Sequence, residues 1–190
     1  MKYLLIIIWG LAMNNLFIFV EGIDDKKFVN EVLANLFYKK SIIVIPITYQ
    51  IKKNNDINKQ IIRCAKSKEC SYVFFSDLDS HSYPCITSRK NARVNEYNAL
   101  NQDNILIVCE EIESWYLAGL DNHLDQFKDF DIGDNTEGIT KEKLSEMIDK
   151  SSFENKVDFF AEVCKTYNLE LAMKRNKSFK YFLSKFNLID

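Results

Sequence analysis

The sequence predicts an α/β fold in which a mostly parallel, four-stranded sheet is flanked by helices, followed by a C-terminal helical extension. Two observations lead to this expectation. Apolar runs alternate with amphipathic segments along the first two thirds of the chain, and alternating strands and helices form parallel sheets through right-handed crossovers. The apolar runs also lack an alternating polar face, which is typical of a sheet covered by helices on both sides.

The first half of this pattern contains two strands and two helices. The run LFIFV at 16–20, bounded by Asn-Asn and Glu-Gly, predicts a buried strand. In 24–40 the apolar residues recur every three or four positions, with acids in the first turn and lysines in the last, as the helix dipole favours. A second strand is expected at 41–48, where Pro46 indicates an edge strand or an irregular end, and a second helix at 56–68.

The pattern continues with strands at 71–77 and 104–110, a short helix at 91–100 between them, and a helix at 111–121 directly after the last strand. The polar, acidic stretch that follows, up to residue 138, has little periodicity and is expected to be a mobile loop.

Three further helices are expected, at 140–150, 153–167 and 178–186. We therefore expect an α/β core over 13–121, with the polar loop and C-terminal helices of 122–190 packed on the same domain.

Composition limits the classes of protein that need to be considered. A chain of 190 residues, 47% of them apolar, is long enough for one domain with a proper core. The net charge of −2 excludes a broadly basic surface that binds nucleic acid without selectivity. No GxxxxGK[ST] or GxGxxG motif supports ATP or NAD binding. The five cysteines form no CxxC pair, which indicates reduced thiols in a cytoplasmic protein.

The first twelve residues, MKYLLIIIWGLA, allow three interpretations. They resemble a signal peptide, they match an extra strand, or translation starts naturally at Met13. The apolar run is too short to span a membrane as a helix. Cleavage near Ala12 would fall within a few residues of the first core strand, which disfavours secretion.

Carboxylates follow three of the four core strands. Glu21 ends the first strand, Asp77 and Asp79 end the third, and Glu113 follows the fourth, close after Glu110 and Glu111, which are interpreted as solvated. In an open parallel sheet, ligands bind beyond the carboxyl ends of the strands, so these acids share one rim.

Residues two apart in an extended segment point the same way, so Asp77 and Asp79 can share one cation. Crowded carboxylates repel one another unless protons or a metal neutralise them, and hard oxygen ligands suit Mg²⁺ or Mn²⁺. A metal held in this way can activate water against a phosphodiester.

The stretches FIFVEGIDDKKF and VFFSDLDS together resemble the TOPRIM domain, which topoisomerases, bacterial primases, OLD-family nucleases and RecR share. The resemblance implies a Rossmann-like sheet, a Mg²⁺ requirement and phosphoryl-transfer chemistry on nucleic acid. Glu21 matches the motif glutamate, and Asp77 and Asp79 match the DxD motif. Asp25 matches a second acid that OLD-type nucleases use for metal.

The chain is most similar to small TOPRIM-like proteins found near defence or toxin–antitoxin genes. The matching features are the DLDS strand end at 77–80, the IESW segment at 112–115, Lys141, and the SF pair at 178–179. In such a site Lys141 would stabilise a phosphate in the transition state.

The leading hypothesis is a metal-dependent nuclease, in which basic C-terminal helices hold the phosphate backbone of DNA or RNA. The alternatives are a non-catalytic TOPRIM module that binds nucleic acid or a neighbouring-gene protein, and a phosphatase or nucleotidyl transferase acting on a small substrate. No membrane partner is expected. The predicted catalytic residues are Glu21, Asp77, Asp79 and Lys141; the metal ligands are Glu21, Asp25, Asp77, Asp79 and Glu113; the nucleic-acid contacts are Lys174, Arg175, Lys177 and Ser178.

Overall fold

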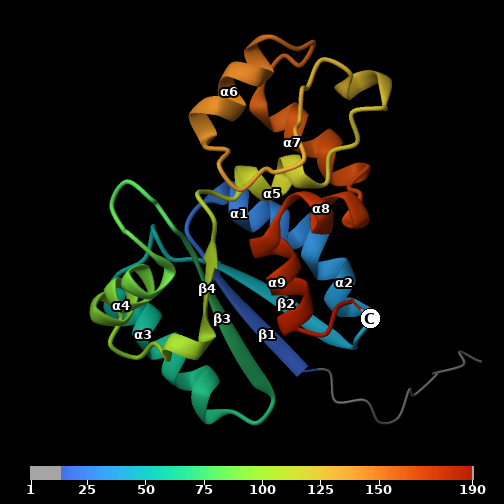
Figure 1. Cartoon of the computed structure of the whole chain (residues 1–190). Helices are drawn as coiled ribbons and strands as arrows, with labels where there is room; N and C mark the ends of the chain where they lie inside the picture. Colours follow the sequence, from blue (N-terminus) through green and yellow to red (C-terminus); the bar gives the residue numbers. More distant parts are fainter. Residues whose placement is uncertain (1–13, 190) are drawn as a thin grey trace, which may run out of the picture.

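The computed structural model describes residues 14–189, so the three interpretations of the first twelve residues lie outside the described part of the chain. Its centre is a four-stranded parallel sheet in the order β2-β1-β3-β4. Its strands are β1 (Asn14–Val20), β2 (Ile42–Thr48), β3 (Cys70–Asp77) and β4 (Ile105–Val108). Helices cover both faces (Figure 1), which confirms the predicted fold class.

β1 is one of the two inner strands and pairs with both β2 and β3. Phe17 lies opposite Ile45 of β2 on one side and opposite Tyr72 of β3 on the other. β2 and β4 are the two edge strands, and Pro46 lies in β2, as the sequence predicts. Because side chains alternate along a strand, each face of the sheet builds a core of its own.

The larger core lies between the sheet and the helices at its right in Figure 1. The predicted helix at 24–40 forms here as α1 (Ile23–Phe28), η1 (Val29–Leu33) and α2 (Ala34–Tyr38), and η1 is π-helical. Trp115 is fully buried at the centre of this core, with its ring edge-to-face against Phe28 and Phe179. The same core contains side chains from α5 (Glu113–Ala118), α7 (Lys156–Lys165), α8 (Leu169–Arg175) and α9 (Lys177–Lys185).

The smaller core is aromatic and lies beneath α3 (Asn54–Lys66) and α4 (Ile86–Glu96). Phe74 of β3 stacks on Phe19 and on Tyr49, with ring centroids 6.0 and 4.5 Å apart. This stack holds Tyr49, which directly follows β2, against the carboxyl end of the sheet.

The structure corrects several predicted boundaries. α4 begins at Ile86, whereas the sequence placed this helix at 91–100. The turn η2 (Gln102–Asn104) precedes a β4 that ends at Val108, so Glu110 lies beyond the strand, with φ of 55°. α8 was not predicted; it ends at Arg175, and the side chain of the next residue, Asn176, caps the following helix α9.

The segment up to residue 138 is not the polar, mobile loop that the sequence suggested. It contains the turn η3 (Asp125–Phe127), and Phe127, Phe130 and Ile132 are buried in the larger core. These apolar side chains have no helical or strand period, which is why the sequence pattern missed them. α6 (Lys141–Asp149) follows, close to the predicted bounds.

None of the helices in the described residues has the length and apolar character needed to cross a bilayer.

Gly119, directly after α5, is a position where the fold requires the absence of a side chain. A Cβ atom here would collide with the ring of Tyr167, whose hydroxyl donates a hydrogen bond to the Trp115 carbonyl at 2.7 Å. We expect Gly119→Ala to lower the free energy of unfolding by about 1–3 kcal/mol, the usual cost of overpacking. Urea denaturation measures this change.

Gly133→Ala is the matched control, because a Cβ atom at Gly133 meets nothing within 4 Å. It should change stability by less than about 1 kcal/mol in either direction. Equal stability of the two variants would show that Tyr167 does not pack on Gly119.

Candidate functional site

A cavity of about 390 Å³ opens at the carboxyl ends of β1 and β3. It brings together all four residues predicted to be catalytic, from three separate parts of the chain. The lining residues are Glu21, Asp77, Asp79, His81, Arg89, Glu110, Glu111, Thr140, Lys141 and Glu142. Six of these are acids, so the cavity is the place where the rim carboxylates face a common space.

Glu21 is held in place by a buried guanidinium group. Its Oε2 atom accepts hydrogen bonds from Arg93 Nη2 and from the Tyr49 hydroxyl, both at 3.0 Å. Arg93 also donates to Ser76 Oγ at 2.9 Å and to Glu96 Oε2 at 2.7 Å. Glu21 Oε1 has no hydrogen-bond partner among residues 14–189, so one carboxylate oxygen is fixed while the other remains available.

The ionisation states in this network are set by burial and by the neighbouring charges. Burial opposes the charge on Arg93, but Tyr49, Glu96 and Glu21 outweigh it and raise the arginine pKa above its usual value. Burial, with the nearby Glu21 carboxylate, raises the Tyr49 pKa well above its usual value although Arg93 opposes this. Tyr49 therefore stays protonated and can donate to Glu21.

Burial and crowded negative charges raise the pKa values of Asp77 and Asp25. Burial, then the charges of Asp25, Glu21 and Glu113, raise the pKa of Asp77 well above its usual value. Burial and the charges of Glu113 and Glu21 raise the pKa of Asp25 to about 7, although the Gly22 amide donates to its Oδ2 atom at 3.0 Å. Such a group of acids is stabilised by protons or by a cation.

Asp79 has a different conformation from the one expected. It has a φ of 51°, in the left-handed region, and its carbonyl accepts hydrogen bonds from the amides of Ser82 and Tyr83 at 2.8 and 3.0 Å. The strand ends at Asp77, so the argument that alternation aligns Asp77 with Asp79 was wrong. Both side chains nevertheless line the cavity, with Asp79 exposed.

Glu113 is buried and paired, and it lies outside the cavity lining. Its Oε1 atom accepts a hydrogen bond from Lys156 Nζ at 2.8 Å, and the same ammonium group lies 2.9 Å from Asp24 Oδ2. Glu113 acts on the cavity through its charge, which raises the pKa values of Asp25 and Asp77.

Lys141 lies at the start of α6, with its side chain 59% exposed. Its Nζ atom is 3.3 Å from Glu111 Oε1, and Glu111 Oε2 accepts a hydrogen bond from the Lys141 backbone amide at 2.5 Å. Glu111 raises the pKa of this lysine, which therefore remains positively charged beside the acids.

The predicted nucleic-acid contacts do not form one exposed surface. Ser178 is buried; its hydroxyl accepts a hydrogen bond from Trp115 Nε1 and donates to Asn176 Oδ1, both at 2.8 Å. Arg175 Nη1 donates to the Leu120 carbonyl at 2.6 Å. Lys174 and Lys177 are exposed. Ser178 and Arg175 therefore serve the packing of α8 and α9, which the basic composition of the segment concealed.

Sequence reasoning missed Arg89 and Arg93, the two arginines of α4. Arg89 Nε donates to the Asp77 carbonyl at 2.6 Å, and its guanidinium group lies 4.4 Å from the centre of the Tyr83 ring. A spacing of four residues places both arginines on one helix face. This spacing is visible in the sequence, but the predicted helix began at residue 91 and so did not include Arg89.

A divalent cation fits the chemistry of this cavity. No three or more histidine, cysteine, aspartate or glutamate side chains within residues 14–189 form a ready-made coordination group. Mg²⁺, however, is commonly held by one or two carboxylates together with waters and substrate phosphates. Asp77, Asp79 and Glu21 supply oxygen donors of this kind, and the pKa of Asp77 is raised first by burial and then by the charges of neighbouring carboxylates.

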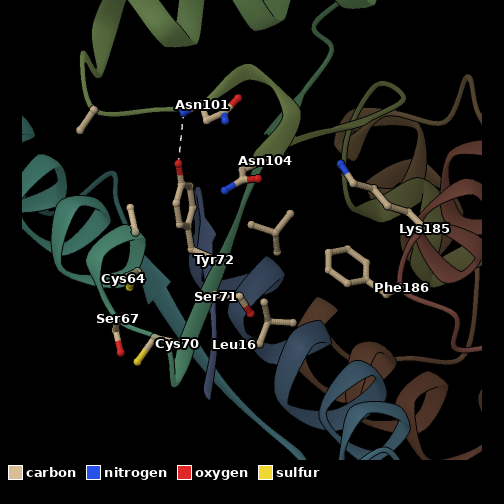
Figure 2. A pocket seen from close by; sticks show the side chains of 13 residues that line it. Leu16, Cys64, Ser67, Cys70, Ser71, Tyr72, Asn101, Asn104, Lys185 and Phe186 are labelled. Atoms are coloured by element: carbon tan, nitrogen blue, oxygen red, sulfur yellow. Dashed lines mark hydrogen bonds between the residues drawn. The ribbon is translucent and has the colours of Figure 1, made fainter. Parts of the chain in front are cut away.

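A second cavity, of about 510 Å³, lies at the opposite, amino-terminal end of the sheet (Figure 2). Tyr72 accepts a hydrogen bond there from the Asn101 amide at 3.1 Å, and Cys64, Cys70 and Lys185 also contribute to the lining. No aspartate or glutamate lines it, so it does not take part in the chemistry predicted for the rim.

Comparison with models of known protein families found no match, and neither curated protein sequences nor solved structures matched the chain.

The Arg93 network makes a direct prediction about stability. Arg93→Met would leave Glu21 and Glu96 without their shared partner, and breaking a buried ion pair costs about 3–5 kcal/mol. Because these carboxylates are 34% and 39% exposed, we expect a smaller loss, about 2–3 kcal/mol of unfolding free energy. Urea denaturation measures it.

The control is Arg63→Met, which changes an exposed arginine on α3 and should cost less than about 0.5 kcal/mol. If both variants were equally stable, Arg93 would not hold the rim together.

Proposed function

We propose that the protein is a Mg²⁺- or Mn²⁺-dependent nuclease that hydrolyses phosphodiester bonds in DNA or RNA. The observation that carries this proposal is that Glu21, Asp77 and Asp79 share one cavity with two cationic side chains, Lys141 and Arg89. The likeness of the same acids to the TOPRIM motifs supports it. A cytoplasmic setting in phage defence is part of the proposal and rests on the cysteine pattern and on that likeness alone.

Five of the lining residues have a part in the proposed reaction. Asp77, Asp79 and Glu21 would hold the cation, which when bound supplies positive charge and polarises a water molecule or a phosphate oxygen. Arg93 and Tyr49 keep Glu21 oriented toward the rim.

Lys141 and Arg89 place positive charge on the cavity wall, where a phosphodiester would bind. A phosphate there would compete with Glu111 for the Lys141 ammonium group and so draw it toward the substrate.

One observation favours a second candidate, a non-catalytic module that binds nucleic acid or another protein. Glu21 already forms an ion pair with Arg93, and Lys141 already pairs with Glu111, so the site is partly compensated without a substrate. A fold alone does not fix a function, and such pairs also occur in structural sites. Binding of nucleic acid without hydrolysis, in the presence of either Mg²⁺ or Mn²⁺, would favour this candidate.

The test is hydrolysis of single- and double-stranded DNA and RNA in Mg²⁺ or Mn²⁺. We expect cleavage of at least one polymer, and a loss of about 100-fold or more in Asp77→Asn and Asp79→Asn, because metal ligands contribute several kcal/mol of transition-state stabilisation. Asp129→Asn is the matched control, an exposed aspartate outside the cavity, and should retain full activity.

Folding of the inactive variants must be verified by thermal unfolding. Asp77→Asn removes a charge that its surroundings disfavour, so without metal this variant should be at least as stable as the parent protein. Absence of cleavage of every polymer, or full activity in a folded Asp77→Asn protein, would refute the nuclease. Turnover of free nucleotides without cleavage of polymers would identify a small-substrate enzyme instead.

A further inference from the structure

The outer edge of β4 is an open sheet edge with a groove beside it. β4 pairs with β3 alone, and α4 and α9 lie on either side of it (Figure 1). A cavity of about 370 Å³ follows this edge, with apolar walls and a few charged side chains in its lining. Its principal lining residues are Ile105 and Ile107 of β4, Ile86 and Lys90 of α4, and Lys177 and Tyr181 of α9.

The register of the sheet shows which backbone groups face this groove. The Leu78 amide donates to the Val108 carbonyl at 2.9 Å, so Val108 bonds toward β3. Alternate residues of a parallel strand bond to the same neighbour, and therefore the backbone of Ile107 points away from β3. Cys109 faces the same outer side, where its amide donates to Ser178 Oγ at 3.4 Å.

The amide and the carbonyl of Ile107 have no hydrogen-bond partner within residues 14–189. Sheltered backbone groups without partners are unfavourable, and an edge strand presents them as a template for another strand. The opposite edge strand, β2, contains Pro46, which cannot donate a hydrogen bond, whereas β4 is the uncharged sequence ILIV. Ile86 and Tyr181 are 49% and 57% exposed on the two walls of the groove.

The charges around the groove restrict what can occupy it. Lys90 and Lys177 line it. Burial and then the charge of Lys90 lower the pKa of Lys185, which lines the cavity at the amino-terminal end of the sheet. Glu137 is the single acid in the lining, and its Oε1 atom already accepts a hydrogen bond from the Ser178 amide at 3.1 Å. A second copy of the same edge would bring these lysines against their own equivalents, which disfavours symmetric pairing.

We propose that the outer edge of β4 binds an extended, acidic segment of a partner protein, which adds to the sheet as a fifth strand. Its backbone would pair with Ile107, its apolar side chains would enter the groove between Ile86 and Tyr181, and its carboxylates would meet Lys90 and Lys177. Strand addition of this kind takes affinity from main-chain hydrogen bonds and specificity from alternate side chains. This inference does not depend on the proposed nuclease activity.

The test uses the full chain and a fluorescein-labelled peptide, Asp-Val-Glu-Ile-Glu-Val-Asp, as the probe. Fluorescence polarisation measures binding, and hydrogen exchange followed by NMR measures protection of individual amides. We expect saturable binding and exchange at the Ile107 amide slowed by about tenfold or more. The Leu106 amide, which bonds toward β3, is the internal control and should change little.

Charge-reversal variants distinguish binding in this groove from non-specific electrostatic attraction of an acidic peptide. Lys177→Glu should weaken binding by about tenfold, while Lys39→Glu, at an exposed lysine after α2, should leave it unchanged. The same peptide with lysine in place of each acid should not bind.

Absence of saturable binding, equal affinity in the two lysine variants, or binding without protection of Ile107 would overturn the proposal. Protection of Ile107 that rises with protein concentration in the absence of peptide would also overturn it, because a second copy would then occupy the edge.

Discussion

The arrangement of the rim depends on one buried cation, the guanidinium group of Arg93. It contacts Glu21 after β1, Tyr49 after β2, Ser76 in β3 and Glu96 in its own helix. A buried charge is costly unless each of its hydrogen-bonding directions is satisfied, and here residues in or directly after three strands supply the partners together with Glu96. Arg93 therefore joins the carboxyl ends of three neighbouring strands and fixes where Glu21 lies relative to Asp77. The position of the acids follows from this contact as much as from the sheet itself.

The same rim concentrates negative charge beyond what Arg93 neutralises. Asp77 and Asp25 have raised pKa values because burial and neighbouring carboxylates disfavour their charged forms. Lys156 pairs with Glu113 and Asp24, and Lys141 pairs with Glu111, so the available cations compensate the periphery of the acid group. Asp77 and Asp79 remain without an ion pair among residues 14–189. This uncompensated pair of carboxylates is the reason for proposing a divalent cation at the cavity.

Much of the fold could be predicted from the sequence because its signals are local. The apolar strands, the crossover helices and the rim position of Glu21, Asp77 and Asp79 follow from periodicity and from the geometry of parallel sheets. The remaining features depend on contacts between distant residues. The partners of Arg93 come together only when α4 packs on the sheet. Ser178 looks like a surface residue in the sequence, but it is buried and accepts a hydrogen bond from Trp115. Phe127 and Phe130 are buried although they follow neither a helical nor a strand period. The left-handed conformation of Asp79 is a property of the turn that the strand pattern does not reveal.

The most direct test of the central claim is the position of a bound metal ion. Crystals of the protein soaked in Mn²⁺ would give an anomalous scattering peak wherever the ion binds. The structure predicts a peak at about 2.0–2.3 Å from carboxylate oxygens of Asp77 and Asp79, between the distances typical of Mg²⁺ and of Ca²⁺. Occupancy should be lost in crystals of Asp77→Asn. A peak elsewhere on the chain, or no peak in crystals with an accessible rim, would contradict the assignment of this cavity as a metal site.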